Sequence, residues 1–242
     1  MRPTQLLGIA LLALGATGLL WYFLKNGPQQ NAMHAREIAT RGLAEYLAKK
    51  FPGQRAIVLS NPFSQHADAA PEIKEAEAAG IRGLRKGFEN KITLAAIAYP
   101  ELKPEAEKDP RAVFIDPATT TPLSFLVAEN SFDKASREHP GTEIIVSLIG
   151  MPAELDKVEI WKASGPPAFA LLWPDLRLIG DATALKTAMA SGKLAAFVLH
   201  KPKGIEDAVR PEHDFNTEFE SRFLLVTPDN VEKMLEIYSG LF

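Results

Sequence analysis

The chain lacks cysteine altogether. This absence excludes disulfide bridges, thiol catalysis, iron–sulfur clusters, cysteine-ligated zinc and lipids attached to cysteine. Two nucleotide-binding fingerprints are also missing, since the sequence has neither a Gly-x-Gly-x-x-Gly segment after an apolar run nor a Walker-type Gly-Lys-Ser/Thr loop. It has no Gly-x-Ser-x-Gly nucleophile elbow either. We therefore expect no bound cofactor and no ordinary serine hydrolase.

An excess of positive charge is missing as well. The 242 residues include 27 Lys and Arg against 30 Asp and Glu, a formal net charge of −3. Because nucleic-acid partners need a concentrated basic face, we expect none. The histidines stand at positions 34, 66, 139, 200 and 213, without the spacing of a metal motif. We expect no metal site.

One long uncharged run stands out near the amino terminus. From Leu6 to Leu24 no residue is charged, and Trp21 and Tyr22 lie near its end. As a helix it spans about 28 Å, close to the roughly 30 Å of a hydrocarbon core. Bulky residues occupy the place where signal peptidase needs small ones, and Trp and Tyr favour membrane interfaces. The run predicts an uncleaved transmembrane anchor. The alternatives are a cleaved signal, which makes the protein secreted, and a buried core helix.

The anchor divides the chain into three parts. Residues 1–26 form the anchor, residues 27–31 a polar linker marked by Gly27-Pro28, and residues 32–242 a single α/β domain. Basic residues flank the apolar run on both sides, so their count does not decide the orientation. By analogy with bacterial secretion anchors, we expect the amino terminus in the cytoplasm and the large domain outside, in the periplasm.

Apolar runs of strand length alternate with helix-like segments along this domain. Runs such as Ile144 to Ile149 are almost continuously apolar, which is typical of strands covered on both faces. The alternation predicts a doubly wound, mostly parallel sheet with helices on both faces. The predicted strands are 56–60, 92–98, 112–115, 144–149, 168–173, 194–199 and 222–226, and the predicted helices are 34–50, 71–88, 122–138, 153–163, 183–191 and 228–238.

The carboxyl ends of the strands are where such sheets bind ligands. Trp173 ends the predicted strand 168–173 and Asp175 comes soon after it, and His200 stands at the end of the predicted strand 194–199. Imidazole binds carboxylates or acts as a general base. One alternative is therefore a hydrolase-like enzyme in which His200 works with Asp175 or Asp116. Another is a purely structural scaffold.

The segment from Glu206 to Glu220 is long, polar and irregular in sequence. Loops of this length in compact domains are typical of lids, binding segments or flexible insertions. The sequence does not choose among these three roles.

The turn Asn61-Pro62-Phe63 directly follows the first predicted strand, and a helix and a strand from Ile92 come after it. This unit resembles the opening unit of type 1 periplasmic binding proteins and of lactose-repressor-type effector domains. The resemblance implies a cleft for a sugar or other small polar ligand, in which Asn61 hydrogen-bonds a ligand hydroxyl and Phe63 packs beneath it. Ser64 stands where the family commonly has a second aromatic residue. The alternative is that Asn61 only forms the turn.

Together these patterns predict a membrane-anchored extracytoplasmic domain that binds a small polar ligand or an envelope protein without catalysing a reaction. The predicted ligand-binding residues are Asn61, Phe63, Ser64, Trp173, Asp175 and His200.

Overall fold

The computed structural model describes the backbone of residues 3–211 and 213–241 and the side chains of residues 27–211 and 213–241. The predicted membrane span at 6–24 therefore lies outside the described side chains. Within the part of the chain that is described, no helix has the length and apolar character needed to cross a membrane.

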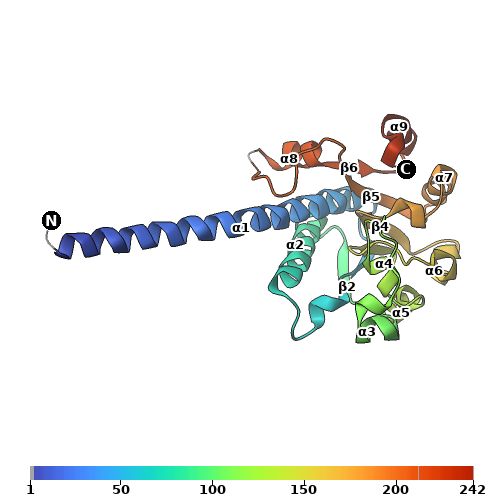
Figure 1. Ribbon diagram of the computed structural model, residues 1–242. Helices are drawn as coiled ribbons and strands as arrows, with labels where there is room; N and C mark the ends of the chain where they lie inside the picture. Colours follow the sequence, from blue (N-terminus) through green and yellow to red (C-terminus); the bar gives the residue numbers. More distant parts are fainter. Residues whose placement is uncertain (1–2, 212, 242) are drawn as a thin grey trace.

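A six-stranded sheet forms the centre of the molecule (Figure 1). Its strand order is β2-β1-β3-β4-β5-β6, in which the first five strands are parallel and β6 is antiparallel to β5. The predicted α/β class with a mostly parallel sheet is confirmed. The strands are β1 (Arg55–Leu59), β2 (Thr93–Ala98), β3 (Ile144–Ser147), β4 (Ala168–Leu172), β5 (Leu194–His200) and β6 (Phe223–Val226).

Helices cover both faces of this sheet. α1, α2 and α8 contribute to an apolar cluster on one face, whereas α5, α7 and α9 contribute to a second cluster on the other face. Because β3 and β4 lie between the two clusters, their side chains are almost all buried, as their apolar sequences predict. The helices are α1 (Pro3–Lys50), α2 (Pro71–Phe88), α3 (Pro104–Lys108), α4 (Leu123–Leu126), α5 (Ser131–Glu138), α6 (Glu159–Lys162), α7 (Ala182–Ala190), α8 (Phe215–Arg222) and α9 (Val231–Ile237).

α1 runs antiparallel to the parallel strands and packs closely on α2. At Gly83 a Cβ atom would lie 2.1 Å from the Thr40 hydroxyl oxygen and 2.2 Å from the Glu37 carbonyl oxygen. At Gly87 it would lie 2.5 Å from the Arg41 carbonyl oxygen. Glycine is thus the residue that lets the two backbones touch here. This contact fixes the level at which α1 lies along α2.

The helix predicted over 34–50 is confirmed, but it is longer than predicted. α1 continues through residues 27–31, where the sequence predicts a linker, and Pro28 lies inside it. A proline inside a helix removes one hydrogen bond and crowds the preceding turn. The other backbone hydrogen bonds of this long helix keep it continuous at Pro28.

The predicted strand over 112–115 is wrong. Residues 110–112 form a short 3₁₀ turn and the residues after it stay outside the sheet. Val113 and Ile115 pack against the core, whereas the side chain of Phe114 between them is 80% exposed. The alternation of the apolar run is therefore real, but it serves a loop that covers the sheet rather than a paired strand.

Two predicted helices are each divided into two shorter elements, and the helix predicted over 228–238 is α9, from Val231 to Ile237. Residues 122–138 divide into α4 and α5, because Val127 is extended and bridges Leu102. Residues 153–163 divide into a 3₁₀ turn and α6. In both places tertiary contacts of the extended residues prevail over the helical periodicity.

The close contact between α1 and α2 makes a direct prediction. We expect Gly83→Ala to lower the free energy of unfolding by about 1–3 kcal/mol, the usual cost of overpacking. Gly27→Ala is the matched control, because a Cβ there meets nothing within 4 Å and alanine is favoured over glycine in a helix by up to about 1 kcal/mol. Urea unfolding of both variants checks this expectation. Equal stability of the two would contradict the close approach.

Candidate functional site

Trp173 and His200 form a stacked pair at the carboxyl edge of the sheet. Trp173 follows β4 and His200 ends β5, and the two strands are neighbours. The ring centroids are 4.5 Å apart and the planes are inclined by 26°. The side chain of His200 is 52% exposed. The pair therefore presents aromatic surface at the position where open parallel sheets bind ligands.

Trp173 has two unusual features. Its φ is +48°, a left-handed conformation that bulky residues rarely adopt. Its indole N–H is buried and has no hydrogen-bond partner in the described part of the chain. Strained backbone and unpaired polar groups concentrate at functional sites, because the surrounding structure must pay for them. Both features mark Trp173 as a site residue.

The loop between β5 and α8 supplies a carboxylate to His200. Nε2 of His200 lies 3.0 Å from Oδ2 of Asp207. The guanidinium of the buried Arg222 holds this loop, donating to the carbonyl oxygens of Glu206 at 2.5 Å and Val209 at 2.9 Å on either side of Asp207. Arg222 also pairs with the buried carboxylate of Glu218 at 2.8 Å. Asp207 is thus positioned by a buried ion pair.

A second, part-buried ion pair joins Trp173 to the end of β1. The Arg36 guanidinium carbon lies 5.4 Å from the centre of the Trp173 ring, and Nη2 of Arg36 pairs with Glu77 at 2.7 Å. The other oxygen of Glu77 accepts hydrogen bonds from the Ser60 hydroxyl at 2.6 Å and the Asn61 backbone N–H at 3.2 Å. Through Glu77 and Arg36, the Asn61 turn and the Trp173–His200 pair belong to one contiguous network.

Asn61 forms the turn that follows β1. Its side-chain Oδ1 accepts from the backbone N–H of Phe63 at 3.0 Å and caps the short 3₁₀ helix Pro62–Gln65. The Ser64 hydroxyl donates to the Asn61 carbonyl oxygen at 2.6 Å. Phe63 packs on the cluster of the α5 and α7 face and stands edge-on to His66, with centroids 5.4 Å apart. The side chain of Asn61 therefore forms the turn.

Asp175 and Asp116 share one arginine. Arg177 binds Asp175 at 2.6 Å and Asp116 at 3.1 Å, and the Thr119 hydroxyl donates to Asp175 at 2.8 Å. Burial opposes ionisation of Asp175, but the hydrogen bonds from Arg177 and Thr119 and the charge of Arg177 prevail and lower the pKa of its carboxyl. Neither carboxylate is the one that binds His200. That partner is Asp207, so pairing His200 with Asp175 or Asp116 is corrected.

The predicted site residues are thus divided between the two faces of the sheet. Trp173 packs with the cluster on the α1 and α2 face, whereas Phe63 packs with the cluster on the opposite face. Within the described residues, no group of three or more His, Asp and Glu side chains is arranged to hold a metal ion.

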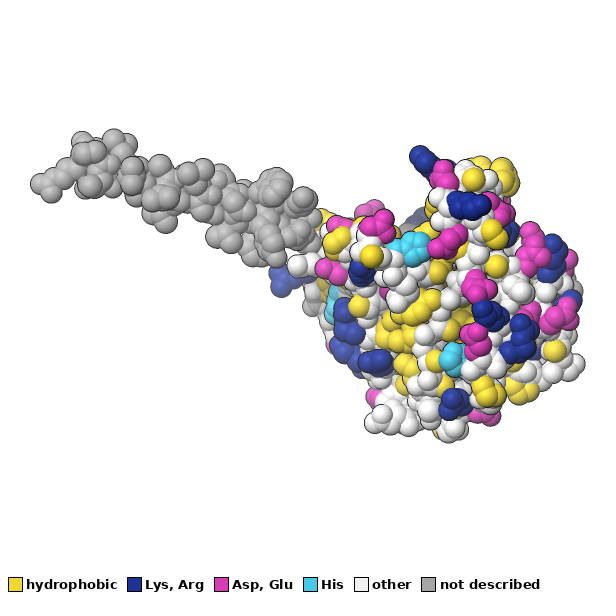
Figure 2. Space-filling view, turned by 90° about the horizontal axis from the view of Figure 1, so that it is seen from below, with side chains coloured by type: hydrophobic (Ala, Val, Ile, Leu, Met, Phe, Trp, Pro, Cys, Tyr) yellow, Lys and Arg dark blue, Asp and Glu magenta, His cyan; other side chains and the backbone are white. Residues whose placement is uncertain are grey.

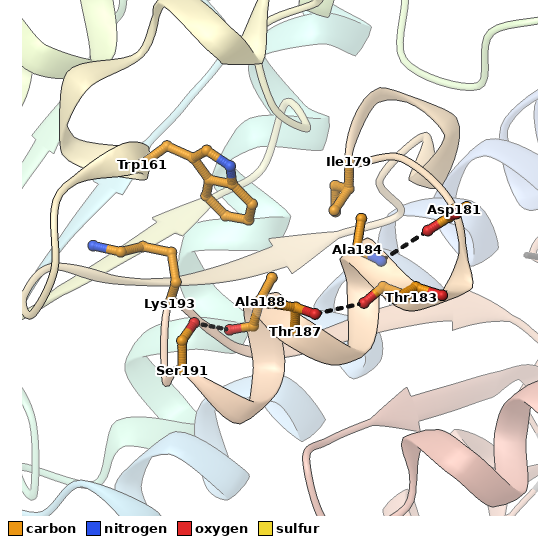
Figure 3. Close-up of a pocket in the computed structure, with 9 residues that line it drawn as sticks. All are labelled: Trp161, Ile179, Asp181, Thr183, Ala184, Thr187, Ala188, Ser191 and Lys193. Atoms are coloured by element: carbon orange, nitrogen blue, oxygen red, sulfur yellow. Dashed lines mark hydrogen bonds between the residues drawn. The ribbon is translucent and has the colours of Figure 1, made fainter.

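One open cavity lies away from all of these residues. It measures about 580 Å³ and lies between α6 and α7, with Trp161, Ile179, Ala184 and Ala188 among its lining (Figure 3). The polar groups around it bond locally: Asp181 accepts from the Ala184 N–H, and the Thr187 and Ser191 hydroxyls bond to helix carbonyls. Because these groups already have hydrogen-bond partners, the cavity offers few donors or acceptors to a polar ligand.

Lys193 borders the same cavity and is also fully engaged. Its ammonium donates to the carbonyl oxygens of Ile160, Gly165 and Pro167. Burial lowers the pKa of this ammonium. Its role is to hold the chain between α6 and β4.

Three residues of this site, Arg36, Glu77 and Asp207, were not predicted from the sequence. Glu77 lies next to the apolar stripe of α2 that contains Gly80 and Leu84, and it is buried. A charged residue beside such a stripe signals a buried partner. Asp207 carried no comparable signal, because its loop mixes apolar and charged residues without a pattern and only the tertiary contact with His200 distinguishes it. The same segment, predicted as irregular over 206–220, contains α8 from Phe215 onward.

The lowered pKa of Asp175 gives a pH-dependent prediction. Such a group stabilises the fold above its ordinary pKa of 3.8, and this contribution is lost as the pH falls through the lower, folded-state pKa. We expect Asp175→Asn to lower the free energy of unfolding at pH 7 by about 1 kcal/mol, because Arg177 is half exposed, and the difference from wild type to shrink at pH 3.

Asp109→Asn is the matched control for this measurement. Asp109 also precedes an arginine by two residues and accepts its backbone N–H, but the pair lies on the surface. Urea unfolding at both pH values should show little effect of this variant. A pH-independent effect of Asp175→Asn would count against a stabilising carboxylate.

Comparisons with known proteins find similarity at the level of structure. No family model matches the sequence, and no curated protein matches it. Among solved structures, a galactofuranose binding protein has 13% identity and a TM-score of 0.47 over 85% of this chain and 63% of its own. An ABC transporter periplasmic solute binding protein from Actinobacillus succinogenes with bound D-allose has 12% identity and a TM-score of 0.45 over 82% of this chain and 62% of its own.

A carbohydrate transporter from Acidothermus cellulolyticus in complex with myo-inositol has 10% identity and a TM-score of 0.44, covering 85% of this chain and 62% of its own. The chain thus spans less than two thirds of the length of these structures. The predicted resemblance to binding proteins of this type is thus found again at the level of structure.

Proposed function

We propose that this chain is a membrane-anchored binding module that takes a small polar ligand at the carboxyl edge of its sheet, without catalysing a reaction. The observation that supports it most is the stack of Trp173 on His200, which presents aromatic surface beside charged and polar groups. Ligand pockets typically combine such aromatic surface with a few fixed polar groups.

Unmet hydrogen bonds support the same location. The indole N–H of Trp173 and Oδ1 of Asp207 are both buried without a partner in the described part of the chain. An unmet buried polar group costs about 1–3 kcal/mol. One of these atoms is a donor and the other an acceptor, and both belong to residues in contact with His200. A ligand hydroxyl or amide that reaches them relieves this cost, which favours a small, neutral, polar ligand.

The anchor part of the proposal rests on the sequence. The uncharged run from Leu6 to Leu24 has the length of a membrane span. α1 is one helix from Pro3 to Lys50, so the run belongs to the same helix that packs on α2. We place the domain on the extracytoplasmic side, in the periplasm.

Ligand screening tests the binding function. A panel of sugars, polyols and amino acids is measured by thermal shift, and the best binder is then titrated calorimetrically. We expect Trp173→Ala to weaken that binder about tenfold or more, because stacking and buried aromatic area are lost together. Trp161→Phe, at the cavity between α6 and α7, is the control and should leave affinity unchanged. Equal affinities of wild type and Trp173→Ala would place the ligand elsewhere.

An enzymatic role is the second candidate, favoured by the 3.0 Å contact of His200 with Asp207. A carboxylate that orients an imidazole is a recurrent arrangement for general-base catalysis. Ester, amide and phosphoester substrates are assayed with wild type, His200→Ala and Asp207→Asn. For a binding module we expect the three proteins to show the same background turnover. A turnover that both variants abolish, with ligand-free stability unchanged, would establish the enzyme instead.

A further inference from the structure

Most of the exposed large apolar side chains lie in segments that follow the carboxyl ends of two strands. Among the described residues six such side chains are exposed, and four of them belong to the segments that follow the carboxyl ends of β2 and β5. These four are Tyr99, Phe114, Ile205 and Val209. Figure 2 shows apolar side chains exposed among charged ones on the face of the body seen from below. Of these four, Ile205 and Val209 lie close together in the sequence, on the loop after β5.

The loop after β5 lies close to the predicted membrane span. The side-chain amide of Asn31 on α1 donates to the carbonyl oxygen of Ala208 at 2.9 Å. Asn31 is seven residues past Leu24, the end of the uncharged run, which corresponds to about 10 Å along a helix. Figure 1 shows the segment between β5 and α8 lying alongside α1 toward its amino-terminal end. Headgroup regions on each side of a bilayer have a thickness of this order.

The loop is held rigidly enough to present a defined surface. The buried Arg222 binds the carbonyls of Glu206 and Val209, so the backbone that carries Ile205 and Val209 is held by contacts to the body of the domain. Ile205 is 37% exposed and Val209 is 49% exposed. Exposed Lys203 and Arg210 flank them, and two acids lie in between, the exposed Glu206 and Asp207, which pairs with His200. Apolar side chains framed by cations are typical of segments that lie in a membrane interface.

We infer that the loop Ile205–Arg210 is a second membrane contact, which rests on the lipid surface beside the anchor. This inference depends on the anchor in the proposed function. α1 is one continuous helix from the predicted span to Asn31. The loop therefore lies at a fixed height above the bilayer. Since Asp207 belongs to this loop and binds His200, the candidate site lies on the same side of the domain as the proposed contact.

Single-cysteine labelling of the full chain tests this contact, because the protein has no cysteine of its own. Val209→Cys and Ile237→Cys are labelled with a polarity-sensitive NBD fluorophore. Both positions are exposed, but Ile237 belongs to α9 at the far end of the body, where Lys50 pairs with Asp229. Lys50 is 19 residues past Asn31, which corresponds to about 29 Å along α1. The proteins are reconstituted into phosphatidylcholine vesicles with and without phosphatidylglycerol and recovered by flotation.

We expect nitroxide-labelled lipids to quench the label at position 209 and to leave the label at 237 bright. Equal, weak quenching at both positions in floated vesicles would overturn the second contact while leaving the anchor intact. Failure to float would overturn the anchor and the contact together, whereas ligand affinity, measured separately in detergent, reports on the binding site alone. Quenching at 209 that requires a second, co-reconstituted protein would overturn direct lipid contact in favour of a protein partner.

Discussion

Where Gly83 meets Glu37 and Thr40, the backbones of α2 and α1 approach so closely that no side chain fits between them. This contact sets the level of α1 along the sheet, and with it the position of Arg36 near the carboxyl ends of β3 and β4. Arg36 then reaches the Glu77 carboxylate, the Leu148 carbonyl and the ring of Trp173. A shift of one helical turn would leave Glu77 buried without its cation, which is costly in a protein interior.

Two ion pairs stabilise different parts of this edge of the sheet. Arg36 with Glu77 connects the first strand's turn to Trp173, and Arg222 with Glu218 holds the loop that brings Asp207 to His200. Each pair has further hydrogen bonds to backbone groups, which is the condition under which buried charges are tolerated. Trp173, which has a strained backbone, contacts Arg36 of one pair and stacks on His200, which the other pair helps to position. Rigid support on both sides explains how a tryptophan can be held at a positive φ.

Much of the fold was predictable because strand-length apolar runs record burial on both faces. The segments around Ile57, Val146, Leu171 and Phe197 form the strands that their sequences indicate. The prediction was wrong where an apolar run serves a loop, as at Phe114. The direction of β6 could not be predicted from the sequence either. It is antiparallel to β5, so Thr227 lies at the opposite end of the sheet from the other strand-end residues, and a strand's direction leaves no trace in its own composition.

For the site, the sequence by itself determined that aromatic and polar residues follow the strands, since Trp173 and His200 end β4 and β5 and neighbouring parallel strands end at one edge. Only the tertiary structure decided which charges meet there. Arg36 and Glu77 are 41 residues apart in the chain, and Asp207 reaches His200 only because Arg222 fixes its loop. Ion pairing depends on the packing of helices and loops against the sheet, and local sequence patterns carry no record of that packing.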